Sequence, residues 1–234
     1  MKWKVELNGR TSSLSTLSKS FTDDPKIFKE NGEYFLWSSM FTELGNVTEV
    51  RHTAEEIVRS IRNFGNMDSL NIDNLETSCV HRIHEDGSEE IIVKLSAESG
   101  KVRGGSPTIR VGDEVYHPAD QAFERTQLAM KDEKVSELVR LLDRGYNWVN
   151  LYRIYEFIQD NTQSENSIVD LGWWSKSEEN QFKHTANSRK ALGDEARHAK
   201  ESIPSPEEPM TKSEAEKIIG RLVDNWLNHR AQSG

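Results

Sequence analysis

The chain contains one cysteine, Cys79, among 234 residues. A single thiol excludes an intramolecular disulfide, which fits a reducing compartment. The sequence also lacks any run that approaches the ~20 apolar residues of a membrane span, and residues 1–10 have no apolar segment typical of a secretion signal. We therefore expect a soluble, cytoplasmic protein that makes no contact with a membrane.

Basic residues are scarcer than acidic ones. The chain has 30 Lys and Arg and 39 Asp and Glu, which gives a formal net charge of −9. A negative overall field repels the phosphate backbone of nucleic acid. We therefore expect no DNA binding, and RNA binding would need a local basic groove. Apolar residues make up 35% of the chain, which is enough for a packed core under a polar surface.

Motifs of familiar enzymes and cofactor sites are missing as well. No phosphate-binding or dinucleotide-binding glycine pattern and no G-x-S-x-G nucleophile motif occurs. Cys79, His81 and His84 form a C-x-H-x-x-H pattern, but on a strand the first two share one face while the third points to the other. No second Cys/His cluster completes a zinc site, so we expect no metal and no cofactor, and polar side chains on the solvent face of this strand.

The N-terminal half alternates apolar and polar residues in short runs, which is typical of half-buried strands. Asn31-Gly32 lies between two such runs, and this dipeptide favours a two-residue type I′ hairpin turn. Two apolar stripes with helical spacing lie between the strands. The expected strands cover 3–7, 27–30, 33–37, 76–84, 89–97 and a short hairpin over 108–116, and the expected helices cover 12–20 and 46–64, the second capped by Thr48. The pattern over residues 1–117 therefore predicts a sheet of antiparallel hairpins with two helices on one of its faces.

From residue 118 onward the spacing of apolar residues is helical. A proline-rich connector at 203–209 interrupts it, and Thr211 with Glu214 forms a capping box that begins the last helix. The other expected helices cover 119–130, 131–144, 146–160, 176–185 and 191–200. The fold class is therefore α+β, with one domain over 1–117 and a C-terminal helical bundle over 118–234.

Polar side chains gather beside a tryptophan pair between residues 169 and 200. If 191–200 is a helix, Asp194 and Glu195 lie one turn before His198, and a carboxylate there would orient the imidazole as a general base. A structural interpretation is equally physical, because these residues can also cap helices and form surface ion pairs while the tryptophans seal the core. The candidate binding residues are Trp173, Trp174, His184, Asn187, Asp194 and Glu195, and the candidate catalytic residues are Arg189, Arg197 and His198.

The segments 147–161, 172–187 and 193–201, followed by the closing amphipathic helix, resemble a bacterial and phage family of unassigned function. They are also similar to the helical HEPN domains of prokaryotic toxin and defence systems. That resemblance implies metal-independent RNA cleavage by an Arg and a His a few residues apart on one helix. The present spacing departs from this pattern, since Arg197 is adjacent to His198 and eight residues separate Arg189 from it.

Two functions from different classes follow. The favoured one is a non-catalytic interaction or regulatory protein of bacterial or phage origin, linked to phage defence or toxin systems. It would dock through its helical half onto another protein or onto its own copy in a homodimer. The alternative is a HEPN-like ribonuclease, in which His198 acts as general acid or base and Arg189 or Arg197 contacts the phosphate.

Overall fold

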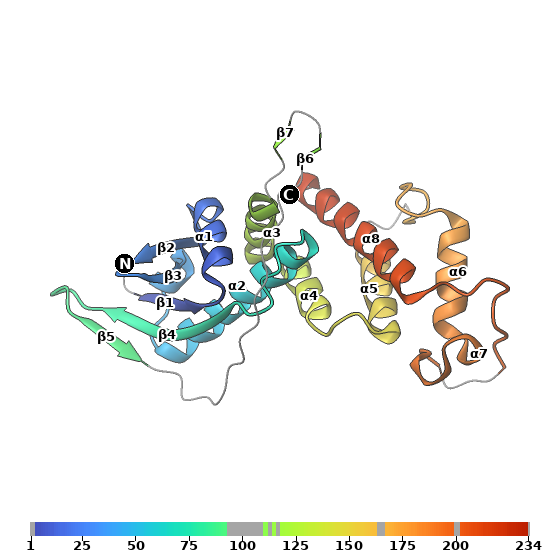
Figure 1. The fold of residues 1–234 in the computed structure, drawn as a ribbon, viewed down its shortest axis with the longest axis horizontal. Helices are drawn as coiled ribbons and strands as arrows, with labels where there is room; N and C mark the ends of the chain where they lie inside the picture. Colours follow the sequence, from blue (N-terminus) through green and yellow to red (C-terminus); the bar gives the residue numbers. More distant parts are fainter. Residues whose placement is uncertain are drawn as a thin grey trace. The chain divides into compact units, whose positions relative to one another are not determined.

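The computed structural model describes residues 3–92, 110–111, 114–115, 118–162, 167–198 and 202–233. The chain forms two compact units, Met1–Asp132 and Glu133–Gly234 (Figure 1). The first unit holds an antiparallel sheet with helices, and the second contains helices and no strand in its described part. The α+β class that the sequence predicts, with strands first and helices after them, is confirmed.

The first unit is built on a five-stranded antiparallel sheet in the order β2-β3-β1-β4-β5. Asn31 and Gly32 join β2 to β3 with φ angles of 50° and 96°, so both central residues have the positive φ that a type I′ turn requires. The hairpin predicted from this dipeptide is confirmed. The strands are β1 (Trp3–Asn8), β2 (Lys26–Glu30), β3 (Glu33–Trp37), β4 (Glu76–Ile83) and β5 (Glu89–Ile92).

One face of this sheet is apolar and carries the core of the unit. Val5 pairs with Leu36 on one side and with Val80 on the other, and all three side chains are fully buried. The helices α1 (Thr11–Ser20) and α2 (Val47–Met67) pack their apolar stripes against the sheet. Asn46 rather than the expected Thr48 caps α2, because its side chain accepts a hydrogen bond from the Glu49 backbone N–H at 3.0 Å.

A third helix, α3 (Pro118–Lys131), belongs to the first unit, although the sequence places the domain boundary before it. Phe123 of α3 packs edge-on against Phe21 with ring centroids 5.1 Å apart. Arg125 of α3 forms a buried ion pair with Asp68, and Gln127 donates to the Asp24 carbonyl at 2.7 Å. The division therefore falls at 132/133, one helix beyond the expected 117/118.

Two further strands, β6 (Arg110–Val111) and β7 (Glu114–Val115), pair antiparallel within the expected 108–116 hairpin. The last residues of the strand expected over 89–97 lie outside the described residues.

The second unit is arranged around α5, which contacts α4, α6 and α8. Residues 203–209 are not helical, as their three prolines predict, and the Thr211–Glu214 capping box begins α8 as expected. The helices are α4 (Glu133–Leu142), α5 (Trp148–Asn161), α6 (Lys176–Asn187), α7 (Arg189–Leu192) and α8 (Lys212–Ser233), with a 3-10 turn, η2, at Gly193–Glu195.

The prediction of a helix over 191–200 is wrong. The chain instead leaves α6, makes the single turn of α7 and continues into η2. Gly193 ends α7 with φ 62° and ψ −130°, a conformation open to glycine and strained for other residues. The Ser188 side chain caps α7 by accepting from the Ala191 N–H.

Among the helices of the described ranges, none offers a segment that is both long and apolar enough to cross a membrane.

Ser175 and Glu178 form a capping box at the start of α6, and an ion pair between Glu178 and α8 makes the stability of this unit depend on pH. Arg221 of α8 donates to Glu178 at 2.5 Å, and this bond, helped by Ser175, lowers the pKa of Glu178 to about 2 from its ordinary value of 4.5. A lowered folded-state pKa adds stability above the ordinary value, and this is lost as pH falls toward 2. We expect Glu178→Gln to reduce the free energy of unfolding at pH 6, with the difference from the parent vanishing near pH 2, in urea denaturation followed by circular dichroism.

The exposed Glu207 offers a control, because Glu207→Gln should track the parent at both pH values. A deficit of Glu178→Gln that is equally large at pH 2 and pH 6 would contradict this account of the ion pair.

Candidate functional site

The candidate residues of the C-terminal half are positioned by an aromatic cluster between α5 and α6. Phe182 of α6 is fully buried, and four rings surround it with centroid distances between 5.4 and 6.1 Å. The surrounding rings are those of Trp148, Tyr152, Tyr155 and Trp174. Trp174 is thus a core residue, and its indole N–H donates to the Ile218 carbonyl at 3.2 Å.

A buried carboxylate completes this cluster. The Tyr155 hydroxyl donates to Glu179 at 2.7 Å, and Lys176 donates to the same carboxylate. Burial acts to raise the pKa of Glu179, but the hydrogen bonds from Lys176 and Tyr155 outweigh it, and the net pKa lies below its ordinary value. Burial, followed by the bond to Glu179, raises the pKa of Tyr155 well above its ordinary value. Tyr155 therefore stays protonated and fixes α6 on α5.

Residues 187–197, which we call the closed loop, leave α6 and return to it. The Arg197 backbone N–H donates to the Ala186 carbonyl at 2.9 Å, so the two ends of the loop meet. Ser188 is fully buried at its base and donates from its hydroxyl to the Ile203 carbonyl at 3.3 Å. Compact loops whose ends lie close together are frequently functional.

The Arg197 side chain holds the returning end of the closed loop onto α5. Its guanidinium lies over the Tyr152 ring, 4.1 Å from the centroid, and donates to Glu156 at 2.8 Å. A cation that is stacked on an aromatic face and paired with a carboxylate is held in one orientation. Arg197 thus serves as a clamp for the loop, and its carboxylate partner is Glu156 of α5.

The other candidate side chains are distributed around the closed loop. Arg189 pairs with Asp194 at 3.2 Å across the loop. His184 lies within 2.9 Å of the Pro204 carbonyl, and the Asn187 amide donates to the Lys183 carbonyl at 2.8 Å, while Ser188 caps the helix that follows. Glu195 and His198 are exposed to solvent, and Asp194 has 96% of its side chain exposed.

This arrangement does not reproduce the geometry on which general-base catalysis by His198 was predicted. That geometry needs Asp194, Glu195 and His198 on one helix, whereas the first two lie in η2 and His198 lies beyond the bend that follows it. The guanidinium groups of Arg189 and Arg197 are both directed to carboxylates, those of Asp194 and Glu156. The loop is therefore suited to present polar side chains for binding.

Trp173 differs from its neighbour Trp174 because it is only half-buried. Its ring packs edge-on against His229 of α8 with centroids 5.5 Å apart. Part of an indole is thereby left at the surface, and tryptophan is enriched among residues that dominate binding energy at interfaces.

A second polar cluster, which the sequence did not predict, lies on the sheet face opposite the apolar core. Lys4 on β1 is 4% exposed and pairs with Glu30 and with Glu89. His81, opposite Lys4 on β4 and 5% exposed, lies 2.6 Å from Glu89 and 3.4 Å from Glu6. Both side chains pack on the Phe35 ring, at 4.4 Å for the Lys4 ammonium and 5.1 Å for the His81 ring.

The electrostatics of this sheet cluster are those of a paired network. Burial opposes the charged form of Lys4, but hydrogen bonds to Glu30 and Glu89 outweigh it and raise the pKa of Lys4 above 10.5. The hydrogen bond from His81 is the largest cause that lowers the pKa of Glu89, and Lys4 adds to it. The expectation that His81 lies on a solvated face is thus corrected, because its neighbours on β1, β3 and β5 cover it. Only the alternation of β1 and β4 hinted at this cluster, since its members come from four separate strands.

Within the described ranges, no group of three or more His, Cys, Asp or Glu side chains is placed to hold a metal ion. Comparisons with protein-family models, with curated proteins and with solved structures find no match to this chain.

The paired network on the sheet predicts that Lys4 stabilises the first unit. Lys4→Met keeps the apolar stem but leaves Glu30 and Glu89 without their shared cation. We expect a loss of about 1–3 kcal/mol in the free energy of unfolding, less than the ~3–5 of a fully buried pair, since both carboxylates are partly hydrated. Urea denaturation of the parent and of Lys4→Met at pH 7 measures this loss in the free energy of unfolding.

The exposed Lys26 on β2 provides the matched control, because Lys26→Met removes the same charge from the same sheet. Equal losses for Lys4→Met and Lys26→Met would show that the ion pairs of Lys4 contribute nothing specific.

Proposed function

We propose that this protein is a non-catalytic binding protein whose C-terminal unit docks, through the closed loop, onto another protein or a second copy of the chain. Following the resemblance to phage and prokaryotic defence families, we place that interaction in a toxin or phage-defence system in the cytoplasm. The loop is the part of the unit that best joins a fixed backbone to exposed polar groups.

The observation that carries this proposal is the hydrogen bond from the Arg197 backbone N–H to the Ala186 carbonyl, reinforced by the Arg197 side chain on Tyr152 and Glu156. These contacts fix both ends of the loop to α5 and α6. A loop that is ordered before binding loses less conformational entropy when a partner docks, which favours affinity.

The outward side chains of the loop determine the kind of partner. Lys190, Asp194 and Glu195 are exposed, with Arg189 beside Asp194, so both signs of charge are presented within a few residues. A mixed-charge surface matches another protein surface better than it matches the uniformly negative backbone of a nucleic acid. The half-exposed Trp173 supplies an apolar group of the same unit.

Metal-independent ribonuclease activity by His198 with Arg189 or Arg197 is the competing function. Its arginines would have to leave Asp194 or Glu156 before either could contact a phosphate. Moving Arg197 would also release the end of the closed loop, so we favour binding over cleavage.

Site-specific crosslinking tests the docking proposal. Replacing the single cysteine by Cys79→Ser permits one new cysteine, Glu195→Cys at the loop tip, to carry a benzophenone. Irradiation of the purified protein detects a second copy, and irradiation in extract of the source cells detects another protein. We expect a discrete adduct, and excess unlabelled parent protein should suppress it. Excess protein with Asp194→Lys and Glu195→Lys should not suppress it, because the exposed loop charges make the contact.

A benzophenone at Glu137→Cys, on the exposed side of α4, is the positional control and should give no such adduct. Suppression by the parent and by the loop variant to the same extent would reject the closed loop as the docking surface.

Incubation of total RNA with the parent and with His198→Ala, in the presence and absence of EDTA, tests the competing function. We expect intact RNA in every reaction, because the arginines are paired with carboxylates. Cleavage that persists in EDTA and disappears in His198→Ala would overturn the non-catalytic assignment.

A further inference from the structure

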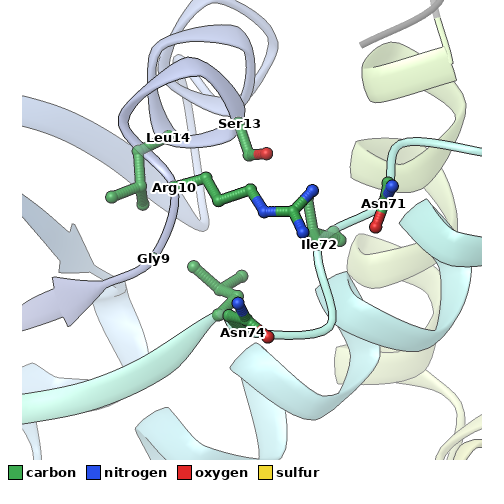
Figure 2. Close-up of a pocket in the computed structure, with 8 residues that line it drawn as sticks. Gly9, Arg10, Ser13, Leu14, Asn71, Ile72 and Asn74 are labelled. Carbon is green, nitrogen blue, oxygen red and sulfur yellow. The ribbon is translucent and has the colours of Figure 1, made fainter. Parts of the chain in front are cut away.

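In the hollow beside the start of α1, the Arg10 side chain extends toward the segment that carries Asn71 and Asn74 (Figure 2). This hollow has room for about one water molecule and a mostly apolar surface, so it belongs to the packing of the first unit. The cluster around Lys4 and His81 on the sheet differs from it, because both of these titratable side chains are buried. A group whose protonation differs between two states of a protein couples pH to the balance between them.

β5 is the least buried strand of this sheet, and it forms one edge of the described sheet (Figure 1). None of its four side chains is buried, and Ile91 has 58% of its surface exposed. Besides the backbone ladder to β4, the Glu89 carboxylate attaches the strand, because it pairs with Lys4 at 3.1 Å and with His81 at 2.6 Å. Elements with few buried apolar contacts open at a low free energy. The attachment of β5 therefore depends strongly on the charges that Glu89 faces.

His81 faces a carboxylate with each of its ring nitrogens. Its Nδ1 lies 2.6 Å from Glu89 of β5, and its Nε2 lies 3.4 Å from Glu6 of β1. A carboxylate accepts hydrogen bonds and donates none, and a neutral imidazole has a single N–H to donate. The protonated ring donates to both carboxylates, whereas the neutral ring turns a lone pair to one of them. Only the protonated form of His81 therefore satisfies both neighbours.

The other groups around His81 do not change charge where a histidine does. Lys4 lies opposite His81 on β1 and pairs with Glu30 of β2 as well as with Glu89, and the uncharged Phe35 of β3 packs edge-on against the His81 ring. The hydrogen bond with His81 is the largest cause of the lowered pKa of Glu89. Burial opposes the charge of Lys4, but its hydrogen bonds to Glu30 and Glu89 outweigh burial and raise its pKa. Both groups thus stay charged between about pH 5.5 and 8.5, the range in which histidine ordinarily exchanges its proton.

We propose that His81 is a pH-sensitive latch, which holds β5 on the sheet while its ring is protonated and loosens the strand when rising pH removes the proton. Lys4 and the protonated ring face three carboxylates, and loss of the proton leaves Lys4 as the single cation among them. The bond between His81 and Glu89 then loses one of its two charges and becomes weaker. The latch belongs to the first unit and is independent of the closed loop.

Opening of β5 would change the surface of the first unit. Phe35 is 5% exposed, and the His81 ring lies against it with centroids 5.1 Å apart. A loosened strand would uncover this aromatic ring together with the backbone edge of β4, and an uncovered strand edge can pair with another chain. The latch would therefore keep the edge closed at mildly acidic pH and release it at mildly alkaline pH.

A pH titration of the chain labelled with carbon-13 and nitrogen-15, followed by nuclear magnetic resonance, tests the latch. We expect the Cε1–H signal of His81 and the backbone amides of residues 89–92 to shift with one shared midpoint between about pH 5.5 and 8.5. After correction for the intrinsic effect of pH, amide hydrogen exchange in β5 should be about five- to tenfold faster above this midpoint than below it. That factor is the difference between a hydrogen bond with two charged partners and one with a single charged partner.

Three variants separate the latch from other titrations. Glu6→Gln should reduce the pH response, because an amide can pair with either form of the ring, and His81→Gln should abolish it. His84→Gln is the matched control, since His84 is an exposed histidine of the same hairpin, 3.6 Å from Glu90, and its loss should leave the response of β5 intact.

Two results for the parent protein would overturn the latch, and they hold even if His81→Gln does not fold. One is a His81 signal that does not titrate between about pH 5 and 9. The other is a His81 signal that titrates while the amides of β5 keep their shifts and exchange rates. A pH response that survives in a folded His81→Gln protein, or that disappears in His84→Gln, would also reject the assignment to His81.

Discussion

The packing of α6 on α5 around Phe182 is the interaction on which the second unit depends. Four aromatic rings enclose this side chain, and the Tyr155 hydroxyl bound to Glu179 fixes the rotation of one helix against the other. Without that register the Ala186 carbonyl and the Tyr152 ring would not both face Arg197. The aromatic core therefore determines whether the closed loop exists in one conformation.

Both units hold a cation in the same way. Lys4 lies on the Phe35 ring between Glu30 and Glu89, and Arg197 lies on the Tyr152 ring beside Glu156. An aromatic face covers the apolar side of the charged group while the carboxylate offsets its loss of hydration. In the first unit this device joins strands of one sheet, and in the second it closes a loop. Arg197, a catalytic candidate from the sequence, is held in this structure by packing and an ion pair. The closed loop offers exposed charges of both signs on a fixed backbone, which suits a broad contact with a protein surface.

Local chemistry determined much of this fold from the sequence. Asn31-Gly32 defined a hairpin, the Ser175–Glu178 and Thr211–Glu214 boxes began two helices, and three prolines excluded a helix at 203–209. Each signal acts within a few residues, where the backbone permits few alternatives. The tertiary structure alone decided the burial of Lys4 and His81, the place of α3 and the path after Asn187. Gly193 was free to adopt a positive φ, and the partner of Arg197 lies 41 residues away on α5, so long-range packing rather than helix periodicity determined the loop.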